Sequence, residues 1–279
     1  MQPIEEEKKP ILKIENMNIS FGEKPIVEDG EFKVYPGEFV LILGENGAGK
    51  SSIFRSIVRE DTNSSCYERL LRLLIKLKIV RKETRVDERD MYFKGELIDS
   101  PSKLDSFRRS IGYARQEDDA DRFFSRKVLR YIKDYVEISQ QFSGLEVEKA
   151  IDDVYTALRC DKYADGEFRD RKLSKCSGGE KRMVTLLSAL ARTKSDLFVL
   201  DEPINNLDAY HARLLNNYLA SLKKRENPPG ILVITHCHMF QCVDRVYKLS
   251  KGKLIEIKDY KPKSCYGECN ECGLYTEEE

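Results

Sequence analysis

The stretch that decides the fold is Phe39-Val-Leu-Ile-Leu-Gly44-Glu-Asn-Gly-Ala-Gly-Lys50-Ser51. Its first five residues form a continuous apolar run, which is typical of a strand buried on both faces of a parallel sheet. The remainder matches G-x-x-x-x-G-K-[ST] at every fixed position, and Ser51–Arg59 continues with helical apolar spacing. A chance glycine turn is disfavoured because a strand precedes the loop and a helix follows it. The stretch therefore predicts a phosphate-binding loop.

The residue types of this loop explain why it would hold ATP. Glycines let the backbone curl so that successive N–H groups face an anion. Lys50 would supply positive charge to the β- and γ-phosphates, and the Ser51 hydroxyl would be a ligand for Mg²⁺. The residues predicted to contact the nucleotide are Gly44, Glu45, Asn46, Gly47, Ala48, Gly49, Lys50, Ser51 and Ser52.

Two further segments are interpreted as functional because a phosphate loop precedes them in the chain. The apolar run Leu197–Leu200 ends in Asp201 and Glu202, which could hold Mg²⁺ and polarise the attacking water, respectively. Alone, this pattern would indicate only a strand and a polar turn. Residues 177–180, Ser-Gly-Gly-Glu, precede a helix expected over Lys181–Arg192, so the serine could cap that helix and free N–H groups could bind an anion.

The remaining periodicity indicates an α/β fold, in which buried strands alternate with helices. Strands are expected at Ile11–Ser20, Gly30–Pro36, Met91–Ile98, Ile111–Arg115 and Ile231–Thr235, with a hairpin formed by Arg245–Leu249 and Lys253–Ile257. Further helices are expected at Val128–Glu137, Glu146–Leu158 and His211–Lys224.

Composition narrows the class of protein. The 279 residues carry 48 Lys and Arg against 48 Asp and Glu, so no nucleic-acid partner is expected from bulk charge. The apolar runs are far shorter than the ~20 residues of a membrane span. The acidic run Glu5–Glu7 near the start, without an apolar stretch behind it, indicates a solvated tail rather than a secretory signal.

In their order along the chain, these motifs resemble those of the ATP-binding cassette (ABC) family over about residues 11–257. Gln116 resembles the Q-loop glutamine, Cys176–Glu180 is similar to the Leu-Ser-Gly-Gly-Gln signature, and Leu197–Glu202 resembles Walker B. Asn206-Leu-Asp208 matches the D-loop, and His236 resembles the switch histidine. The departures are Cys176 for Leu, Glu180 for Gln, and Asn205 at the entry to the D-loop.

The resemblance implies a P-loop NTPase of the ABC type, with a mainly parallel core sheet, an antiparallel β-subdomain and a helical signature subdomain at about residues 117–180. It assigns catalysis to Glu202, His236 and Gln116, and Mg²⁺ binding to Ser51, Gln116 and Asp201. It adds nucleotide contacts from Phe21, which would stack on adenine, and from Ser177, Gly178, Gly179 and Asp208.

The resemblance also implies partners. Each ATP would lie between the phosphate loop of one cassette and the signature of a second, so the chain would act as a homodimer or heterodimer. The leading interpretation is a cytoplasmic ATPase subunit, peripheral to the membrane and bound to a separate transmembrane permease. The alternative is a soluble non-transport ABC ATPase, for example in iron–sulfur assembly. A catalytically dead sensor is disfavoured because Lys50, Asp201, Glu202 and His236 are all present.

Two segments lie outside these motifs. Residues of about 60–90 form an insertion whose expected helix, Tyr67–Val80, is both basic and apolar; it would pack on the β-subdomain or lie on a partner or an anionic bilayer. The tail, residues 258–279, carries Cys265, Cys269 and Cys272, which could bind zinc or an iron–sulfur cluster or be exposed thiols. The eight cysteines are expected to be reduced.

Overall fold

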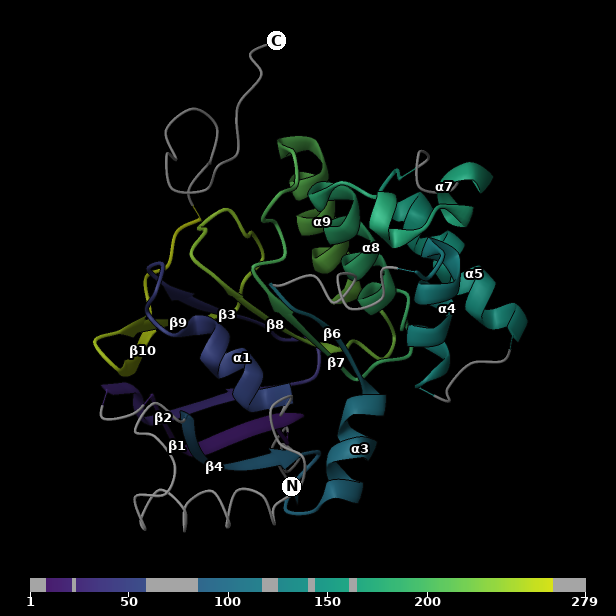
Figure 1. Cartoon of the computed structure of the whole chain (residues 1–279). Helices are drawn as coiled ribbons and strands as arrows, with labels where there is room; N and C mark the ends of the chain where they lie inside the picture. The colour runs from purple at the N-terminus through teal and green to yellow at the C-terminus, as the bar shows by residue number, and fades with distance from the viewer. Residues whose placement is uncertain are drawn as a thin grey trace, which may run out of the picture.

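The computed structural model describes residues 9–21, 24–58, 85–116, 125–139, 144–160 and 165–262, and its centre is a six-stranded sheet (Figure 1). The strand order is β10-β9-β3-β8-β7-β6, and every pairing is parallel except that of β10 with β9. The confirmed parallel core places the carboxyl ends of its strands along one edge. The parallel strands are β3 (Phe39–Gly44), β6 (Ile111–Ala114), β7 (Leu197–Asp201), β8 (Gly230–Thr235) and β9 (Arg245–Ser250), and β10 (Lys253–Ile257) runs in the opposite direction at the edge.

A second, antiparallel sheet has the order β2-β1-β4-β5. Its strands are β1 (Leu12–Phe21), β2 (Lys24–Val34), β4 (Arg85–Phe93) and β5 (Glu96–Leu97). The single strand predicted over Met91–Ile98 is therefore wrong: a turn at Lys94 and Gly95, with φ of 51° and 84°, divides it. The start of β4 also extends into the expected insertion, because its charged residues pair in register with β1 despite their low apolar content.

Helices cover both faces of the core sheet (Figure 1). On one side lie α1 (Lys50–Val58) and α3 (Pro101–Ser110), and on the other a helical lobe built around α8. Helix α3 was not predicted, because only Leu104 and Phe107 are buried along it, although Ser100 caps its start. The other helices are α4 (Val128–Glu137), α5 (Gly144–Ala157), α7 (Gly166–Asp170), the 3₁₀ turn η2 (Leu173–Lys175), α8 (Gly178–Leu190) and α9 (Ala209–Leu222).

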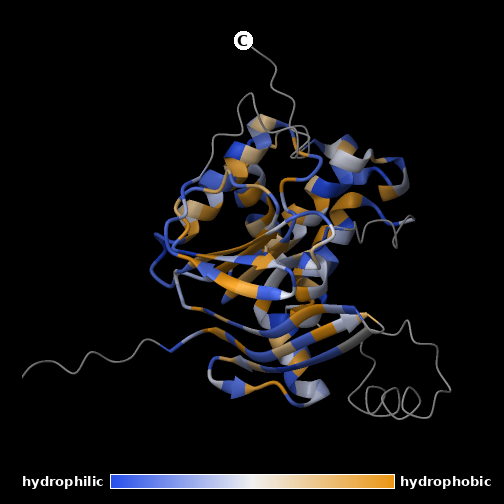
Figure 2. Ribbon diagram, turned by 90° about the vertical axis from the view of Figure 1, so that its left-hand side faces the viewer, coloured by the Kyte–Doolittle hydropathy of each residue, from blue (hydrophilic) through white to orange (hydrophobic). Residues whose placement is uncertain are grey.

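The core divides into two apolar clusters, one on each face of the sheet. Along β3, Phe39, Leu41 and Leu43 join the cluster of the helical lobe, while Val40 and Ile42 join the cluster beneath α1 and the antiparallel sheet. This alternation explains the continuous apolar runs, since side chains on both faces of a covered strand are buried. Figure 2 shows the central strands as a hydrophobic layer between the two halves.

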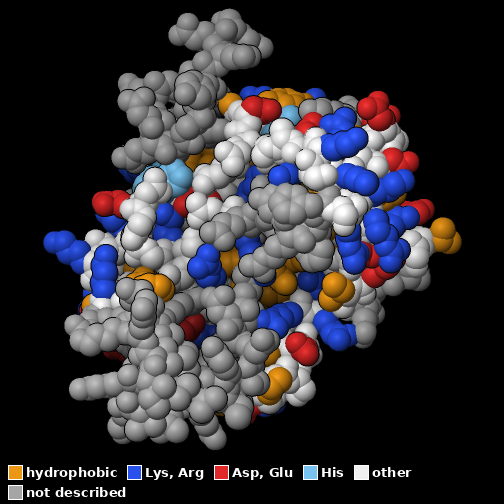
Figure 3. Space-filling view, viewed as in Figure 1, with side chains coloured by type: hydrophobic (Ala, Val, Ile, Leu, Met, Phe, Trp, Pro, Cys, Tyr) orange, Lys and Arg blue, Asp and Glu red, His pale blue; other side chains and the backbone are white. Residues whose placement is uncertain are grey.

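The surface of the helical lobe is rich in Lys and Arg (Figure 3). Several of these cations pair with acids of the same lobe: Lys127 with Asp170 at 2.8 Å, and Arg130 with Asp134 at 2.8 Å. Among the described helices, none is long and apolar enough to cross a bilayer. The predicted helix Tyr67–Val80 and the three tail cysteines lie outside the described residues.

Candidate nucleotide and magnesium site

A cavity of about 880 Å³ opens at the carboxyl edge of the core sheet, where the phosphate loop leaves β3. It brings together segments separated by almost two hundred positions in the chain, from the loop itself to the residue that follows β8. The lining residues are Ile26, Asn46, Gly47, Gly49, Lys50, Ser51, Ser52, Gln116, Glu202, Asn205, Asn206, Leu207 and His236. Its volume lies within the roughly 300–1,000 Å³ range of small-molecule sites.

The phosphate loop adopts a backbone that requires glycine at two positions. Gly47 and Gly49 have φ of 79° and 105°, in the left-handed region where other residues are strained. A Cβ at Gly49 would also lie 2.0 Å from Cγ2 of Ile26, which lines the cavity from β2. The loop passes directly into α1, whose first residue is Lys50. The start of this helix therefore faces the cavity, where an anion is favoured.

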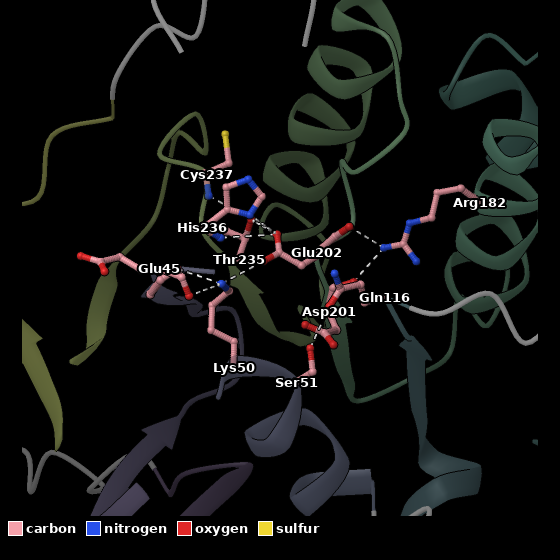
Figure 4. Close-up of polar contacts among 11 residues, drawn as sticks. Glu45, Lys50, Ser51, Gln116, Arg182, Asp201, Glu202, Thr235, His236 and Cys237 are labelled. Atoms are coloured by element: carbon pink, nitrogen blue, oxygen red, sulfur yellow. Dashed lines mark hydrogen bonds and ion pairs between the residues drawn. The ribbon is translucent and has the colours of Figure 1, made fainter. Parts of the chain in front are cut away.

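Lys50 is buried and satisfied by the chain itself in this structure (Figure 4). Its Nζ donates to the carbonyl oxygens of Gly44 and Glu45 at 2.8 and 3.0 Å. The same Nζ lies 3.2 Å from Oε1 of Glu202. The ammonium thus has an anionic partner already in the position from which a phosphate would take it over.

Glu202 is held as a buried carboxylate at the end of β7. Its backbone has φ of 47°, and its Oε2 accepts hydrogen bonds from Thr235 Oγ1 at 2.7 Å and from His236 Nδ1 at 2.9 Å. Burial alone would raise the pKa of Glu202, but the bonds from His236 and Thr235, with the charges of His236 and Lys50, lower it below its usual value. The carboxylate is therefore ionised at neutral pH and can accept a proton.

Three oxygen donors beside Lys50 fit a magnesium ion. Ser51 Oγ donates to Oε1 of Gln116 at 2.9 Å, while the side chain of Asp201 is buried beside them and its Oδ1 has no hydrogen-bond partner within the described part of the chain (Figure 4). Burial raises the pKa of Asp201 to about 6, with the nearby Ser51 hydroxyl opposing the shift. A carboxylate, an amide oxygen and a hydroxyl are the hard ligands that Mg²⁺ prefers. A cation would supply the partner that the Asp201 oxygen lacks.

Arg182 of α8, which was not predicted as a site residue, connects this site to the helical lobe. The side chain is 1% exposed, and its Nη2 donates to the carbonyl oxygens of Asp201 and Glu202 at 2.8 and 2.6 Å. Its Nη1 donates to the carbonyl oxygen of Arg115, next to Gln116. One guanidinium thus fixes the backbone at both acids and at the start of the Q-loop. The sequence feature that could have identified Arg182 is its position as a cation among the apolar residues of α8.

The signature residues do not line this cavity. Ser177 caps α8: its Oγ accepts from the backbone N–H of Glu180 at 3.2 Å, and the Glu180 carboxylate accepts from the N–H of Ser177 at 2.9 Å. Arg171 Nη1 lies 3.3 Å from the other oxygen of Glu180. Gly179 lies close to the D-loop, because a Cβ there would be 3.1 Å from the carbonyl oxygen of Asn206.

Two other predicted nucleotide contacts also lie apart from the cavity lining. Asp208 caps α9 by accepting from the N–H of His211 at 2.8 Å, and it contacts the His211 ring at 2.7 Å. Phe21 is 54% exposed at the end of β1 and available for stacking. Within one chain the structure thus brings together the phosphate loop, Gln116, Asp201, Glu202 and His236, but not Phe21, Asp208 or the signature. Thr235 and Ile26 complete the site and were not predicted.

The chain is similar to a known family and to named proteins. The family described as "ABC transporter" matches residues 27–205. An uncharacterized ABC transporter ATP-binding protein of Methanocaldococcus jannaschii is 26% identical over 278 residues, covering 97% of this chain and 87% of that protein. The energy-dependent translational throttle protein EttA of Mycobacterium tuberculosis is 27% identical over 238 residues, which cover 83% of this chain but only 39% of EttA.

A solved structure gives the same fold. The dimeric structure of a bacterial ABC transporter cassette superposes with a TM-score of 0.67 and 22% identity, covering 88% of this chain and 98% of the other. At that identity the likeness concerns the fold alone.

Proposed function

The chain belongs to the ABC transporter family of ATPases, and from that premise we propose that it hydrolyses ATP at a site shared between two cassettes. The observation that carries the proposal is the buried, ionised Glu202, which lies between Lys50 and His236 in the same cavity as the phosphate loop. A base, a cation and an anion-binding helix start are the groups that phosphoryl transfer to water requires.

The hydrolysis follows from the contacts of these groups. The γ-phosphate takes over the Nζ of Lys50 from Glu202, which leaves Oε1 of the carboxylate free to accept a proton from water. That water oxygen attacks the γ-phosphorus in line, the bond from phosphorus to the β–γ bridging oxygen breaks, and ADP leaves with that electron pair. His236 and Thr235 hold Oε2 of Glu202 throughout, so the base stays aligned. Ser51, Gln116 and Asp201 would hold Mg²⁺, which supplies positive charge against the phosphate oxygens.

A second cassette is part of the proposal because the signature residues of a chain do not line that chain's own cavity. Ser177, Gly178 and Gly179 form the start of α8, where backbone N–H groups favour an anion. We propose that they contact the γ-phosphate bound by a second chain, with Asp208 at the same interface and Phe21 stacking on adenine. The single phosphate loop and single signature of each chain then make two complete sites in a dimer.

The work that hydrolysis drives is a further part of the proposal. The name of the Methanocaldococcus relative, an ABC transporter ATP-binding protein, favours a role in transport. We propose a subunit that is peripheral to the cytoplasmic face and joined to a separate transmembrane permease. The relative named as a translational throttle protein favours the second candidate, a non-transport ABC ATPase that acts on a soluble assembly. Both candidates use the same ATP chemistry and differ only in the partner.

The variant Glu202→Gln tests the catalytic part. It keeps the shape and the bonds from Thr235 but removes the base, so ATP should bind while turnover falls by about 10²–10⁴. Light scattering should then show an ATP-dependent dimer that the wild-type chain forms only transiently. The matched control is Glu226→Gln, at an exposed carboxylate. Turnover of Glu202→Gln at the wild-type rate would overturn the assignment.

The trapped dimer also separates the two candidates. Glu202→Gln protein cross-linked in its native cells with ATP present should capture its partner. Capture of a protein with several membrane spans would support the transporter subunit and contradict the soluble assembly. Capture of soluble proteins alone would reverse that conclusion, while leaving the ATPase assignment intact.

A further inference from the structure

A second cavity, of about 590 Å³, lies at the opposite end of the core strands from the ATP cavity. Residues 193–196, which lead into β7, form one wall, and residues 227–229, which lead into β8, form another. Lys9, Pro10 and Ile11 at the start of β1, with Lys94 from the β4–β5 turn, close it from the antiparallel sheet. At about 3.3 Å per residue, the length of β8 separates the two cavities by roughly 20 Å.

The walls of this cavity are held by the backbone. Gly37 N–H donates to the carbonyl oxygen of Pro229 at 3.2 Å, Gly230 N–H to Asp196 at 2.9 Å, and Lys94 N–H to Ile11 at 2.9 Å. Pro10, Pro36, Pro228 and Pro229 add fixed φ angles to the same walls. Since the segments are already ordered, a ligand would meet a preformed site, which lowers the entropic cost of binding.

The charge of the lining is positive. It contains Lys9, Lys94 and Lys194 against one acid, Asp196, which gives a formal charge of three minus one. Lys94 Nζ lies 2.6 Å from Asp196 Oδ2, and Lys194 contacts Glu146 outside the lining at 3.0 Å. Both pairs are substantially exposed, so each contributes little and can exchange for another anion. The rim therefore favours an anionic ligand.

The interior between these lysines offers apolar surface from Ile11 and the prolines. An aromatic ring would fit the prolines, and its acidic group the lysines.

We propose that this cavity is a second binding site, separate from the ATP site, for a small organic anion that carries a flat ring. The site follows from the cavity lining alone and does not depend on the reaction proposed above. It predicts saturable binding of one such anion per chain. Because the lysines are exposed, the affinity should fall as salt rises, over the range in which the Debye length shortens from about 30 to about 8 Å.

The test uses 8-anilinonaphthalene-1-sulfonate, a fluorescent anion with flat rings, and the full chain saturated with ADP and Mg²⁺ to occupy the ATP cavity. The double variant Lys9→Glu with Lys194→Glu should weaken binding about tenfold or more by reversing two charges at the rim. The matched control, Lys253→Glu with Lys258→Glu, reverses two exposed lysines elsewhere and should change the affinity less than twofold.

A second variant, Asn227→Trp, fills the cavity without changing its charge and should abolish saturable binding. Unchanged ATPase rates and melting temperatures verify that both cavity variants are folded. Equal binding by the wild type, both cavity variants and the control would overturn the proposal, as would the lack of any saturable binding to the wild type.

Discussion

Helices α1 and α8 both begin beside glycines, and the two helix starts differ in what surrounds them. The start of α1 lies in the large cavity, where Lys50, Glu202 and His236 gather within one chain. The start of α8 lies away from the cavity lining, and its own Glu180 carboxylate closes a capping box with Ser177. Both helix starts favour anions, but Lys50 of α1 faces the cavity with a base beside it, whereas the buried Arg182 of α8 binds backbone carbonyl oxygens.

From this difference we propose that one half of the reaction site is complete in the chain and that the other half is provided to a neighbour. The phosphate loop should then bind ATP alone, because Lys50 has only to exchange Glu202 for a phosphate. The signature offers N–H groups and a hydroxyl, and the Arg171 cation near it lies beside Glu180. We propose that the signature contributes to a phosphate that another chain already holds.

Removing the cation at α1 should have the largest effect. Lys50→Ala takes away the charge that holds the phosphates and costs about 2–5 kcal/mol, which is about thirtyfold or more in ATP affinity. Titration calorimetry of the single chain measures the loss. Lys33→Ala, at an exposed lysine of β2, is the control. An ATP affinity within threefold of the wild type would contradict the role of Lys50.

Asp201 offers a pH-dependent test of the magnesium site. The pKa of its buried carboxyl is raised from 3.8 to about 6, so ionisation in the folded protein is unfavourable and costs about 3 kcal/mol above pH 6. Asp201→Asn should therefore melt on the order of 5 °C higher than the wild type at pH 7.5 without Mg²⁺.

The difference in melting temperature between Asp201→Asn and the wild type should depend on pH in one direction. Because the wild-type carboxyl is increasingly protonated in the fold as pH falls, the difference should shrink between about pH 6 and pH 4. Asp259→Asn, at an exposed carboxylate, should show no such trend. Added Mg²⁺ should stabilise the wild type and not Asp201→Asn. A melting difference independent of pH would contradict the assignment.

Arg182 tests whether the two halves are joined within one chain. The single nitrogen of Lys cannot span the carbonyl oxygens that the two Nη atoms of Arg182 reach, so Arg182→Lys should displace both acids slightly. Turnover should fall about tenfold while ATP affinity changes little, since small misplacements of reacting groups are costly. Steady-state kinetics separates the two, with Arg213→Lys as an exposed control. Equal losses in affinity and turnover would indicate a merely structural role.

The smallest effect is expected at the departure from the signature. Glu180→Gln keeps the capping box, because glutamine also serves at that position, and loses the ion pair with Arg171. The change in unfolding free energy should be within about 1 kcal/mol. Glu180→Ala, which removes the capping bond as well, should cost more. A larger loss in the glutamine variant than in the alanine variant would contradict the capping role.

The sequence predicted the parts of this molecule in which local pattern and spatial neighbours agree. The run Phe39–Leu43 is apolar because both faces of β3 are covered, and the loop after it requires glycine for its backbone. The start of β4 could not be predicted, since its charged residues become a strand through pairing with β1 rather than through their own pattern.

The site shows the same division. The acids after β7 follow an apolar strand and are visible in one segment. Arg182 and Thr235 are not, because their importance lies in bonds to residues up to 67 positions away, to Arg115 and Glu202. Contacts between residues so far apart along the chain depend on the whole fold. In the sequence, the available sign of Arg182 is a cation at a position where the helical pattern of α8 is otherwise apolar.

The most direct test of the shared site is complementation between two inactive chains. Lys50→Ala removes the phosphate-loop half and Ser177→Arg blocks the signature half, so each homodimer should be inactive. In an equal mixture, half of the dimers are mixed and each has one intact site, so ATPase should recover to about a quarter of the wild-type rate. A mixture that stays as inactive as its components, although mixed dimers form, would contradict the shared site.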